Sequence, residues 1–231
     1  MRQAIVTGGS HGLGLAMAEG FLAKGFGVIV LDVNPCPLEG IDYIPMDLSK
    51  PEDIDCAFAQ IERRYGTAHV LVNNGAVTKY EKPISEVSVS DYDTILNTNL
   101  RGAYLCAKAF IALNQGQDYG RIINLASTRF HQNEGDWELY GMSKGGIVSL
   151  TNSLCVSLMG TPITVNAISP GYIHTGDEVL EPRDHQIHPS NRVGIPRDIA
   201  NVCLFLADEE NDFINGANIV VDGGMTKRMI Y

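Results

Sequence analysis

Basic residues are scarce in this chain of 231 residues. Its 17 lysines and arginines face 27 aspartates and glutamates, and the formal net charge is -10. A protein that binds nucleic acid needs a basic surface to neutralise phosphates, and an anionic membrane attracts basic segments for the same reason. We therefore expect neither nucleic acid nor a membrane as a partner.

Cysteine and histidine are present without the spacings that bind metals. The cysteines are odd in number and form no CxxC pair, and the histidines form no HExxH motif. This pattern is typical of buried thiols in a reducing compartment rather than of disulfides or a zinc site. We expect no metal, and we expect the histidines at the surface or in a loop over the substrate. The residues are Cys36, Cys56, Cys106, Cys155 and Cys203, and His11, His69, His131, His174, His185 and His188.

Long apolar runs are missing as well. No run approaches the roughly 20 apolar residues of a membrane helix. The chain passes from Met1 and Arg2 directly into a β-branched run, without the regions of a secretory signal. We therefore expect a cytoplasmic protein.

What the chain does contain is an alternation of short β-branched runs with longer segments of helical apolar spacing. Apolar strands separated by helices imply a parallel sheet covered on both faces. The prediction is one doubly wound α/β domain, residues 1–231, with a parallel seven-stranded sheet flanked by helices on both faces. Strands are predicted at residues 4–6, 28–31, 43–44, 70–72, 121–124, 164–167 and 218–221, and helices at 13–24, 51–65 and 146–158.

A glycine-rich turn, TGGSHGLG at residues 7–14, joins the first predicted strand to the first predicted helix. In such a turn, backbone N–H groups approach the pyrophosphate of a dinucleotide at the helix N-terminus, and side chains would obstruct that approach. The glycines at 8, 12 and 14 therefore favour nucleotide binding, although packing alone also produces turns of this composition.

Asp32 ends the second predicted strand, 18 residues after Gly14. A carboxylate at this strand tip accepts hydrogen bonds from the ribose hydroxyls of NAD and repels the 2′-phosphate of NADP. His11 is mostly neutral near pH 7 and offers a phosphate little. We predict NAD as the cofactor; the simpler alternative is a solvated acid at a loop.

Tyr140 and Lys144 are four residues apart in a helical segment, which places both side chains on one helix face. A tyrosine with a pKa of about 10 is a poor base at neutral pH, but a neighbouring ammonium group and a cationic nicotinamide both favour the phenolate. Ser127 follows the fifth predicted strand, at the edge where parallel sheets bind substrates. Taken singly, these residues could be a surface Tyr–Lys pair and a turn cap.

Together these motifs resemble those of the short-chain dehydrogenase/reductase family, in the family's order and over essentially the whole chain. Each marker is weak alone, and the set is specific. The resemblance implies a Rossmann fold and hydride transfer between NAD and a small alcohol or carbonyl substrate. It also implies a homodimer or homotetramer paired through the helix of Tyr140 and the last strand. The further markers are Asp47-Leu48, Asn73-Asn74-Gly75, Asn99, Pro170-Gly171 and Asp222-Gly223-Gly224.

The resemblance implies a role for each matching residue. Tyr140 would exchange the substrate proton, Ser127 would hold the substrate oxygen, Lys144 would anchor the nicotinamide ribose, and Asn99 would hold a water that relays protons to Lys144. The residues expected to contact the cofactor are Gly8, Ser10, His11, Gly12, Leu13, Gly14, Asp32, Asp47, Leu48, Asn74, Gly75, Tyr140, Lys144, Pro170, Gly171, Ile173 and Thr175.

Several of these residues have simpler alternative roles. Asp47 could cap the helix at 51–65, Asn73 and Asn74 could satisfy turn backbone, and Asn99 could bond helix backbone. On the helix of Tyr140, the apolar side chains suit an oligomer interface and core packing equally well. They are Ile147, Leu150 and Leu154.

The chain departs from the family pattern at two places. It reads Asn73-Asn74-Gly75-Ala76 where the family usually has Asn-Asn-Ala-Gly, and segment 176–191, expected to cover the substrate, is short. A short polar cover favours a sugar, polyol or similar small alcohol over a steroid. The side chains expected around that substrate are Arg129, Phe130, His131, Trp137, His174, Asp177 and Glu178.

Three other functions stay open. A dehydratase or epimerase of related fold also uses a Tyr–Lys pair, but the short chain and the compact end at Asp222 favour a dehydrogenase. A nucleotide-sensing or scaffold protein would need none of the four catalytic positions. An NADPH-dependent carbonyl reductase would differ only in its cofactor, and Asp32 argues against it.

Overall fold

The computed structural model describes residues 1–78 and 80–229. Its centre is a parallel sheet of seven strands in the order β3-β2-β1-β4-β5-β6-β7, which confirms the predicted doubly wound architecture. The strands are β1 (Gln3–Thr7), β2 (Gly27–Asp32), β3 (Asp42–Pro45), β4 (Val70–Asn73), β5 (Gly120–Leu125), β6 (Ile163–Pro170) and β7 (Asn218–Val221).

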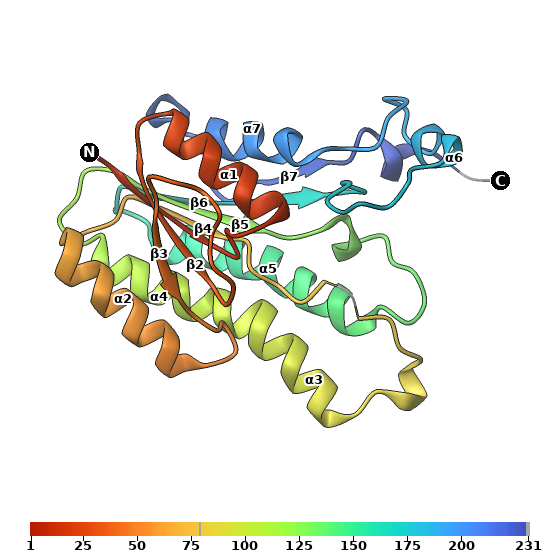
Figure 1. Ribbon diagram of the computed structural model, residues 1–231, viewed down its shortest axis with the longest axis horizontal. Coiled ribbons are helices and arrows are strands. Elements are labelled where there is room, and N and C mark those ends of the chain that lie inside the picture. Colours follow the sequence, from red (N-terminus) through yellow and green to blue (C-terminus); the bar gives the residue numbers. More distant parts are fainter. Residues whose placement is uncertain (79, 230–231) are drawn as a thin grey trace.

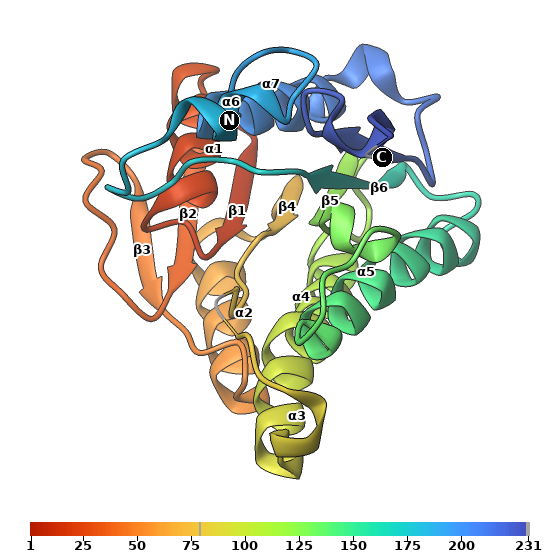
Figure 2. The ribbon, with the colours of Figure 1, turned by 90° about the vertical axis from the view of Figure 1, so that its right-hand side faces the viewer.

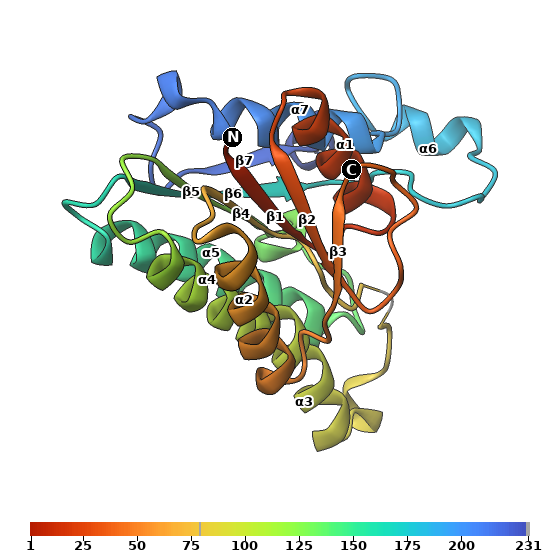
Figure 3. The ribbon, with the colours of Figure 1, turned by 60° about the vertical axis from the view of Figure 1, so that its left-hand side comes forward.

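Helices cover both faces of this sheet. Helices α1 and α7 pack together on one face, and α2, α4 and α5 cover the other, while α3 projects away from the sheet (Figure 1). Figure 3 shows β3 at one margin of the sheet, between these two layers. The helices are α1 (Gly12–Ala23), α2 (Pro51–Tyr65), α3 (Val89–Leu96), α4 (Gly102–Leu113), α5 (Glu138–Ser157), α6 (Pro182–Gln186) and α7 (Pro196–Ala207).

The apolar residues of each strand serve both layers, because successive side chains of a strand point to opposite faces. Ile5 of β1 packs on the side of α2 and α4, and its neighbour Val6 packs on the side of α1 and α7. Both side chains have no exposed surface. This double burial explains why the strands are continuous apolar runs rather than alternating ones.

Helix α5 begins at Glu138, before the apolar spacing predicted at 146–158, and it includes Tyr140 and Lys144, which were predicted to share a helix face. Its first turns lack the apolar spacing that marks a helix in sequence, because polar side chains occupy the buried face there: Ser143 and Lys144 are buried. Farther along, Ile147 packs in the core, and Leu150 lies against the same cluster. These apolar residues therefore belong to the core of this chain, as Leu154 does.

Between α3 and α4 the chain forms a π-helical turn, η2 (Asn97–Arg101). The backbone N–H of Gly102 donates to the carbonyl of Asn97, five residues back, so this turn holds one residue more than a regular α-helical turn. Turns of this kind place a side chain where a regular helix would not, and here the buried residue is Asn99.

The expectations about cysteine and histidine were wrong in part. Cys106 and Cys203 are buried, but Cys56 is exposed and Cys36 and Cys155 are only half-buried. His69 is half-buried just before β4, where its Nδ1 accepts the backbone N–H of Gln3 at 3.1 Å. Burial of Cys106 raises the pKa of its thiol to about 12, as expected for an inert thiol. No helix within the described residues combines the length and apolarity needed to cross a bilayer.

Candidate active site

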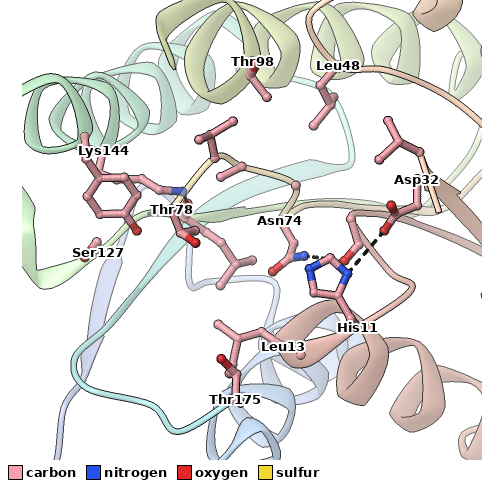
Figure 4. A pocket seen from close by; sticks show the side chains of 18 of the residues that line it. His11, Leu13, Asp32, Leu48, Asn74, Thr78, Thr98, Ser127, Lys144 and Thr175 are labelled. Carbon is pink, nitrogen blue, oxygen red and sulfur yellow. Dashed lines mark hydrogen bonds and ion pairs between the residues drawn. The ribbon is translucent and has the colours of Figure 1, made fainter. Parts of the chain in front are cut away.

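A cavity of about 1100 Å³ opens along the carboxyl ends of the strands. Helix α3 and the α6 segment lie on opposite sides of this end of the molecule (Figure 2). Ser127 and Lys144 lie toward one end of the cavity, and Asp32 and His11 lie toward the other (Figure 4). Every residue expected to contact a cofactor lines this cavity except Ser10 and Gly14.

The glycine turn forms one wall. Gly8 has a left-handed backbone (φ 62°), its N–H donates to the carbonyl of Leu31 at 2.8 Å, and a Cβ there would stand 2.6 Å from the Cα of Gly75. A Cβ on Gly14 would overlap the carbonyl of Gly8. Glycine at these two positions brings the turn against α1, with the helix N-terminus open to the cavity. Gly14 and Ser10 thus belong to the turn without lining the cavity.

Asp32 is the charged group at the far end of the cavity. One carboxylate oxygen accepts the backbone N–H of Ser10 and the other accepts that of Asn34, both at 3.0 Å, and the residue is 5% exposed. The exposed ring of His11 stands 4.0 Å from the carboxylate. The backbone bonds fix the carboxylate in place, and it still lines the cavity with lone pairs to spare.

Asp47 and Leu48 continue this end of the cavity. Asp47 accepts the backbone N–H and the hydroxyl of Ser49 at 2.9 and 2.7 Å. Burial alone would raise the pKa of Asp47, but the bonds from Ser49 and the nearby Lys50 outweigh it and hold the pKa below its ordinary value. The predicted alternative of a cap on α2 is wrong in detail: the residue before that helix is Lys50, and Asp47 caps the preceding turn.

Asn74 holds two loops together. Its side-chain amide donates to the carbonyls of Thr7 and Gly8 at 3.0 and 2.9 Å, and the Thr7 hydroxyl accepts the backbone N–H of Asn74 and of Gly75. The segment after β4 is therefore fastened to the glycine turn. The turn-satisfying role considered for Asn74 is real, and the residue also lines the cavity.

Ser127, Tyr140 and Lys144 come together at the other end. Ser127 follows β5 and is 9% exposed, and its Oγ accepts the backbone N–H of Arg129 at 3.3 Å. The Lys144 ammonium lies 5.7 Å from the centre of the Tyr140 ring and donates to the carbonyl of Leu125 at 2.7 Å. A strand end and the first turns of α5 thus direct all three side chains into one cavity.

The electrostatics of this group differ from the sequence expectation. Burial raises the pKa of Tyr140, while a hydrogen bond from Ser127 and the charge of Arg129 oppose that rise. The sequence predicts a lowered pKa for Tyr140, whereas in the protein without cofactor burial raises it; burial also lowers the pKa of the Lys144 ammonium to about 8. Tertiary burial decides both shifts, and it cannot be read from a four-residue spacing.

Asn99 lies beneath this group rather than in the cavity. Its Oδ1 accepts the backbone N–H of Val77 at 2.7 Å, and its Nδ2 donates to the carbonyl of Val77 and to the hydroxyl of Ser143. Asn99 therefore fastens the loop following β4 to α5, next to Lys144. The backbone-bonding alternative describes these contacts.

A second cavity, of about 920 Å³, adjoins Ser127 and Tyr140. Of the side chains expected around a substrate, Arg129 and Trp137 line it, Glu178 lines the first cavity, and Phe130, His131, His174 and Asp177 line neither. Sequence reasoning missed ten further lining residues, some from the segment that follows Ser127 and the others from segments distant in the chain. They are Thr78, Thr128, Gln132, Asn133, Glu134, Tyr172, Ile187, Met225, Arg228 and Met229.

The family model described as enoyl-(acyl carrier protein) reductase matches residues 8–226 of this chain. The chain belongs to the short-chain dehydrogenase/reductase family. The match runs from the glycine turn to the residues after Asp222, so it includes all residues that line the two cavities except Arg228 and Met229. The family uses nicotinamide cofactors.

The relatives of this short-chain dehydrogenase/reductase are oxidoreductases. An uncharacterized oxidoreductase of Thermotoga maritima is 39% identical over 99% of this chain and 97% of its own. The 3-oxoacyl-[acyl-carrier-protein] reductase MabA of Mycobacterium tuberculosis is 32% identical over 97% of this chain and 92% of its own. These matches support an oxidoreductase while leaving substrate and cofactor open.

Two solved structures of the family have the same fold. The apo SCOR enzyme from Clostridium thermocellum is 36% identical, with a TM-score of 0.91 over 100% of this chain and 95% of its own. The ligand-free aldohexose dehydrogenase of Thermoplasma acidophilum is 29% identical, with a TM-score of 0.93 over 99% of this chain and 95% of its own. The architecture is therefore that of known family members.

The departure from the family pattern at Gly75-Ala76 has a local explanation. A Cβ at position 75 would stand 2.5 Å from the Leu48 side chain and 3.2 Å from the Gly8 nitrogen. The loop after β4 thus runs very close to the wall formed by Leu48, and glycine at 75 permits that approach. The swap adjusts the loop without removing Asn74 from its bonds.

The first cavity also has a wall that sequence reasoning missed. It comes from α3 and η2, whose residues carry no motif and were not assigned to a predicted helix. Only their position opposite the glycine turn reveals them (Figure 4 labels Thr98). They are Ser90, Asp93, Thr94, Asn97 and Thr98.

Proposed function

We propose that this chain is an NAD-dependent oxidoreductase that transfers hydride between nicotinamide and a small polar alcohol or carbonyl substrate. The observation that carries this proposal is the convergence of Ser127 and Tyr140 on one cavity, with the buried ammonium of Lys144 beside them. A cavity long enough to reach from these residues to Asp32 suits a dinucleotide, and Gly12, the first residue of α1, lines it where the helix N-terminus would face the phosphates.

The chemistry assigned to each side chain follows from its position. Bound NAD supplies the hydride acceptor. Tyr140 takes the alcohol proton in oxidation and returns it in reduction, and Ser127 holds the substrate oxygen beside the phenol. Lys144, fixed by the carbonyl of Leu125, holds a positive charge below the ring and binds ribose hydroxyls. Asn99 positions α5 through Ser143, and the proton relay through a water beside Lys144 is part of this proposal.

The choice of NAD rests on the charges that line the first cavity. Among its lining residues, all within the described part of the chain, Asp32 and Asp47 stand at the end opposite Ser127, and Lys144 is the only lysine or arginine. A 2′-phosphate at that end would face these carboxylates with no lysine or arginine among the lining residues there, and Lys50, which lies outside the lining, is already paired with Asp47 at 3.7 Å. Such repulsion costs several kcal/mol in a low-dielectric site. The balance supports NAD over NADP.

A polar substrate is supported by the second cavity, which mixes hydrogen-bonding side chains with the flat rings of Trp137 and Tyr172. The resemblance to an aldohexose dehydrogenase points the same way. The alternative is an NADPH-dependent carbonyl reductase, suggested by the resemblance to MabA. The acidic end of the first cavity argues against it.

Other classes receive less support. A sensor or scaffold protein has no use for Ser127, Tyr140 and Lys144 in one cavity, and neither a dehydratase nor an epimerase is suggested by the named relatives. We also propose a cytoplasmic homodimer or homotetramer. Light scattering of the purified protein tests its assembly.

Steady-state kinetics with NAD and NADP tests the proposed function. The panel pairs sugars, polyols and hydroxy acids with steroids and long-chain alcohols. We expect kcat/KM to favour NAD by about 100-fold or more and the polar substrates by at least about 10-fold. Equal use of both cofactors, or a tenfold preference for the apolar class, contradicts the corresponding half of the proposal.

A further inference from the structure

Arg129 is a charged residue that lines the second cavity. The proposed hydride-transfer chemistry assigns no role to its side chain. It lies two residues after Ser127, in the short helix η3 (Thr128–Phe130), and its backbone N–H donates to the Ser127 hydroxyl. Its guanidinium stacks 4.2 Å from the centre of the Trp137 ring, and that ring stands edge-on to Tyr140 at 6.0 Å. Stacking thus holds a flat cation beside the reacting side chains.

The hydrogen-bonding capacity of this guanidinium is only partly used. Nη2 donates to a carboxylate oxygen of Glu134 at 2.7 Å, but Nη1 is buried without a partner. A buried N–H that lacks an acceptor is unfavourable, and an arginine donates best through two parallel bonds to one carboxylate. Glu134 therefore bonds only one of the two terminal nitrogens of the guanidinium, and 72% of its side chain is exposed. An exposed pair of this kind contributes little stability, so its partner can be exchanged.

The charges of the cavity point in the same direction. Its charged lining residues, taken from the described part of the chain, are Arg129, Glu134 and Arg228, whose guanidinium donates to the carbonyl of Gln186 at 2.5 Å. The cavity therefore carries a net positive charge in a protein of net charge -10. A local excess of cations in an acidic protein favours an anionic ligand at this place.

We propose that Arg129 is a specificity-determining residue that binds a carboxylate of the substrate, which takes the place of Glu134 on the guanidinium. The substrate class is then a hydroxy acid, or the corresponding oxo acid in the reverse direction. The inference rests on the proposed function for the reacting end of that substrate. A carboxylate fits better than a phosphate, because the group now bonded to Nη2 is itself a carboxylate and a planar carboxylate matches the planar guanidinium.

The geometry connects this site to the reacting one. Ser127 and Arg129 are joined by a backbone-to-hydroxyl bond, so the distance between the alcohol oxygen and the carboxylate of a bound substrate is set by one short turn. A hydroxy acid whose two groups match that distance would be oriented at both ends. A neutral alcohol would be held at one end only, and it would leave the cation with Glu134.

The single tryptophan of the chain, Trp137, makes the site observable without turnover. Its fluorescence should change when a ligand exchanges partners on the stacked guanidinium. We would titrate the protein with lactate, 3-hydroxybutyrate and gluconate. The controls replace the carboxylate by CH2OH, as propane-1,2-diol, butane-1,3-diol and glucitol, and inorganic phosphate is a further probe.

We expect at least one hydroxy acid to change the fluorescence saturably, with its diol or polyol partner at least about 10-fold weaker. Arg129→Gln should weaken that acid at least about 10-fold, and Arg129→Lys, which keeps the charge but loses the fork, should fall between. Glu134→Gln should tighten binding several-fold by freeing the fork. Arg63→Gln, on the exposed face of α2, should match the wild type. Equal affinity for acids and their neutral partners, a response to phosphate alone, or no effect of Arg129→Gln overturns the proposal.

Kinetics separates this inference from the proposed function. The ratio of kcat/KM for a hydroxy acid to that for its neutral partner, measured with NAD, should exceed about 10 and collapse in Arg129→Gln. Acid binding without NAD reduction for any alcohol would refute the proposed function alone. Oxidation of neutral polyols with no preference for acids, and with no tryptophan response to acids, would refute the role of Arg129 alone.

Discussion

The sheet has an amino edge, where its parallel strands begin, and a carboxyl edge, where they end. The two edges carry similar residues that serve different purposes. At the amino edge, Tyr119 lies between the guanidinium groups of Arg2 and Arg121, 4.0 and 4.4 Å from its ring centre, and its hydroxyl donates to the carbonyl of Ala207. At the carboxyl edge, Tyr140 stands near Arg129 and Lys144 but faces a cavity. At the amino edge the tyrosine and its cations pack against each other, whereas at the carboxyl edge they line a cavity that a ligand can enter.

The difference lies in what surrounds the polar groups. Arg121 is 2% exposed and donates to the carbonyls of Gly120 and Asp208, although its Nε is buried without a partner. Arg129 also has a buried N–H without a partner, at Nη1, but its side chain lines a cavity. Neither residue type nor an unpartnered N–H therefore separates a structural cluster from a binding one, whereas an unpartnered N–H on a residue that lines a cavity does.

The largest expected effect is at Tyr140. Tyr140→Phe should lower kcat at least about 10³-fold, because it removes the proton carrier and keeps the ring. Affinity for NADH, measured by fluorescence titration, should stay within about threefold. Tyr104→Phe, on the exposed side of α4, is the control and should keep full activity. Near-normal turnover of Tyr140→Phe would show that another residue transfers the proton.

A smaller effect is expected at Asp32, at the other end of the same edge. Asp32→Ala should reduce the preference for NAD over NADP from about 100-fold to below about 10-fold, mainly by weakening NAD. The ratio of kcat/KM values measures it, with Asp55→Asn on the exposed face of α2 as the matched loss of a carboxylate. An unchanged ratio would show that Asp47 or the loop after β2, rather than Asp32, determines the preference for NAD.

Lys144 should make stability depend on pH. Its pKa is about 8 in the folded protein and about 10.4 when unfolded, so the unfolded chain holds the proton more tightly. Stability should therefore rise between about pH 8 and 10, and the penalty of the buried charge is complete below pH 8. We expect the free energy of unfolding of the wild type, relative to Lys144→Met, to rise by about 2 kcal/mol over this range.

Urea unfolding of both proteins at pH 7, 8, 9 and 10 measures this difference. The raised pKa of Tyr140 lets the unfolded tyrosine ionise first near pH 10, which lowers stability in both proteins and largely cancels in the comparison. A difference that stays flat across the range would mean that Lys144 is better solvated than its burial indicates.

The smallest effect is expected at the amino edge. Arg121→Met should lower the free energy of unfolding by about 1–2 kcal/mol, because the carbonyls of Gly120 and Asp208 lose their donor. Its kcat should stay within about twofold of the wild type. Loss of activity with unchanged stability would show that Arg121 has a functional rather than a structural role, which contradicts the comparison of the two edges.

The sequence was sufficient wherever a function depends on neighbours along the chain. The glycine turn, Asp32 at a strand tip and the Tyr140–Lys144 spacing are local patterns, and the cavity includes them. The stacking of Arg129 on Trp137 depends on how the turn between them folds, and the bonds of Asn99 to Val77 and Ser143 and the wall from α3 depend on distant segments. Apolar spacing marked α5 only from residue 146, because the buried face of its first turns is polar, although the Tyr140–Lys144 spacing indicated a helix there.

The π-helical turn η2 has a consequence for how this chain tolerates insertions and deletions. A regular α-helical turn holds about 3.6 residues, and η2 absorbs one residue more within a single turn. Removing one residue from η2 would therefore restore an unbroken helix in which the buried stripe of α4, with Cys106 and Phe110, still faces the sheet. What the deletion would remove is the displaced position of Asn99, and with it the bond to Ser143. A one-residue deletion here should leave a folded chain in which α5 is no longer fastened to the loop after β4.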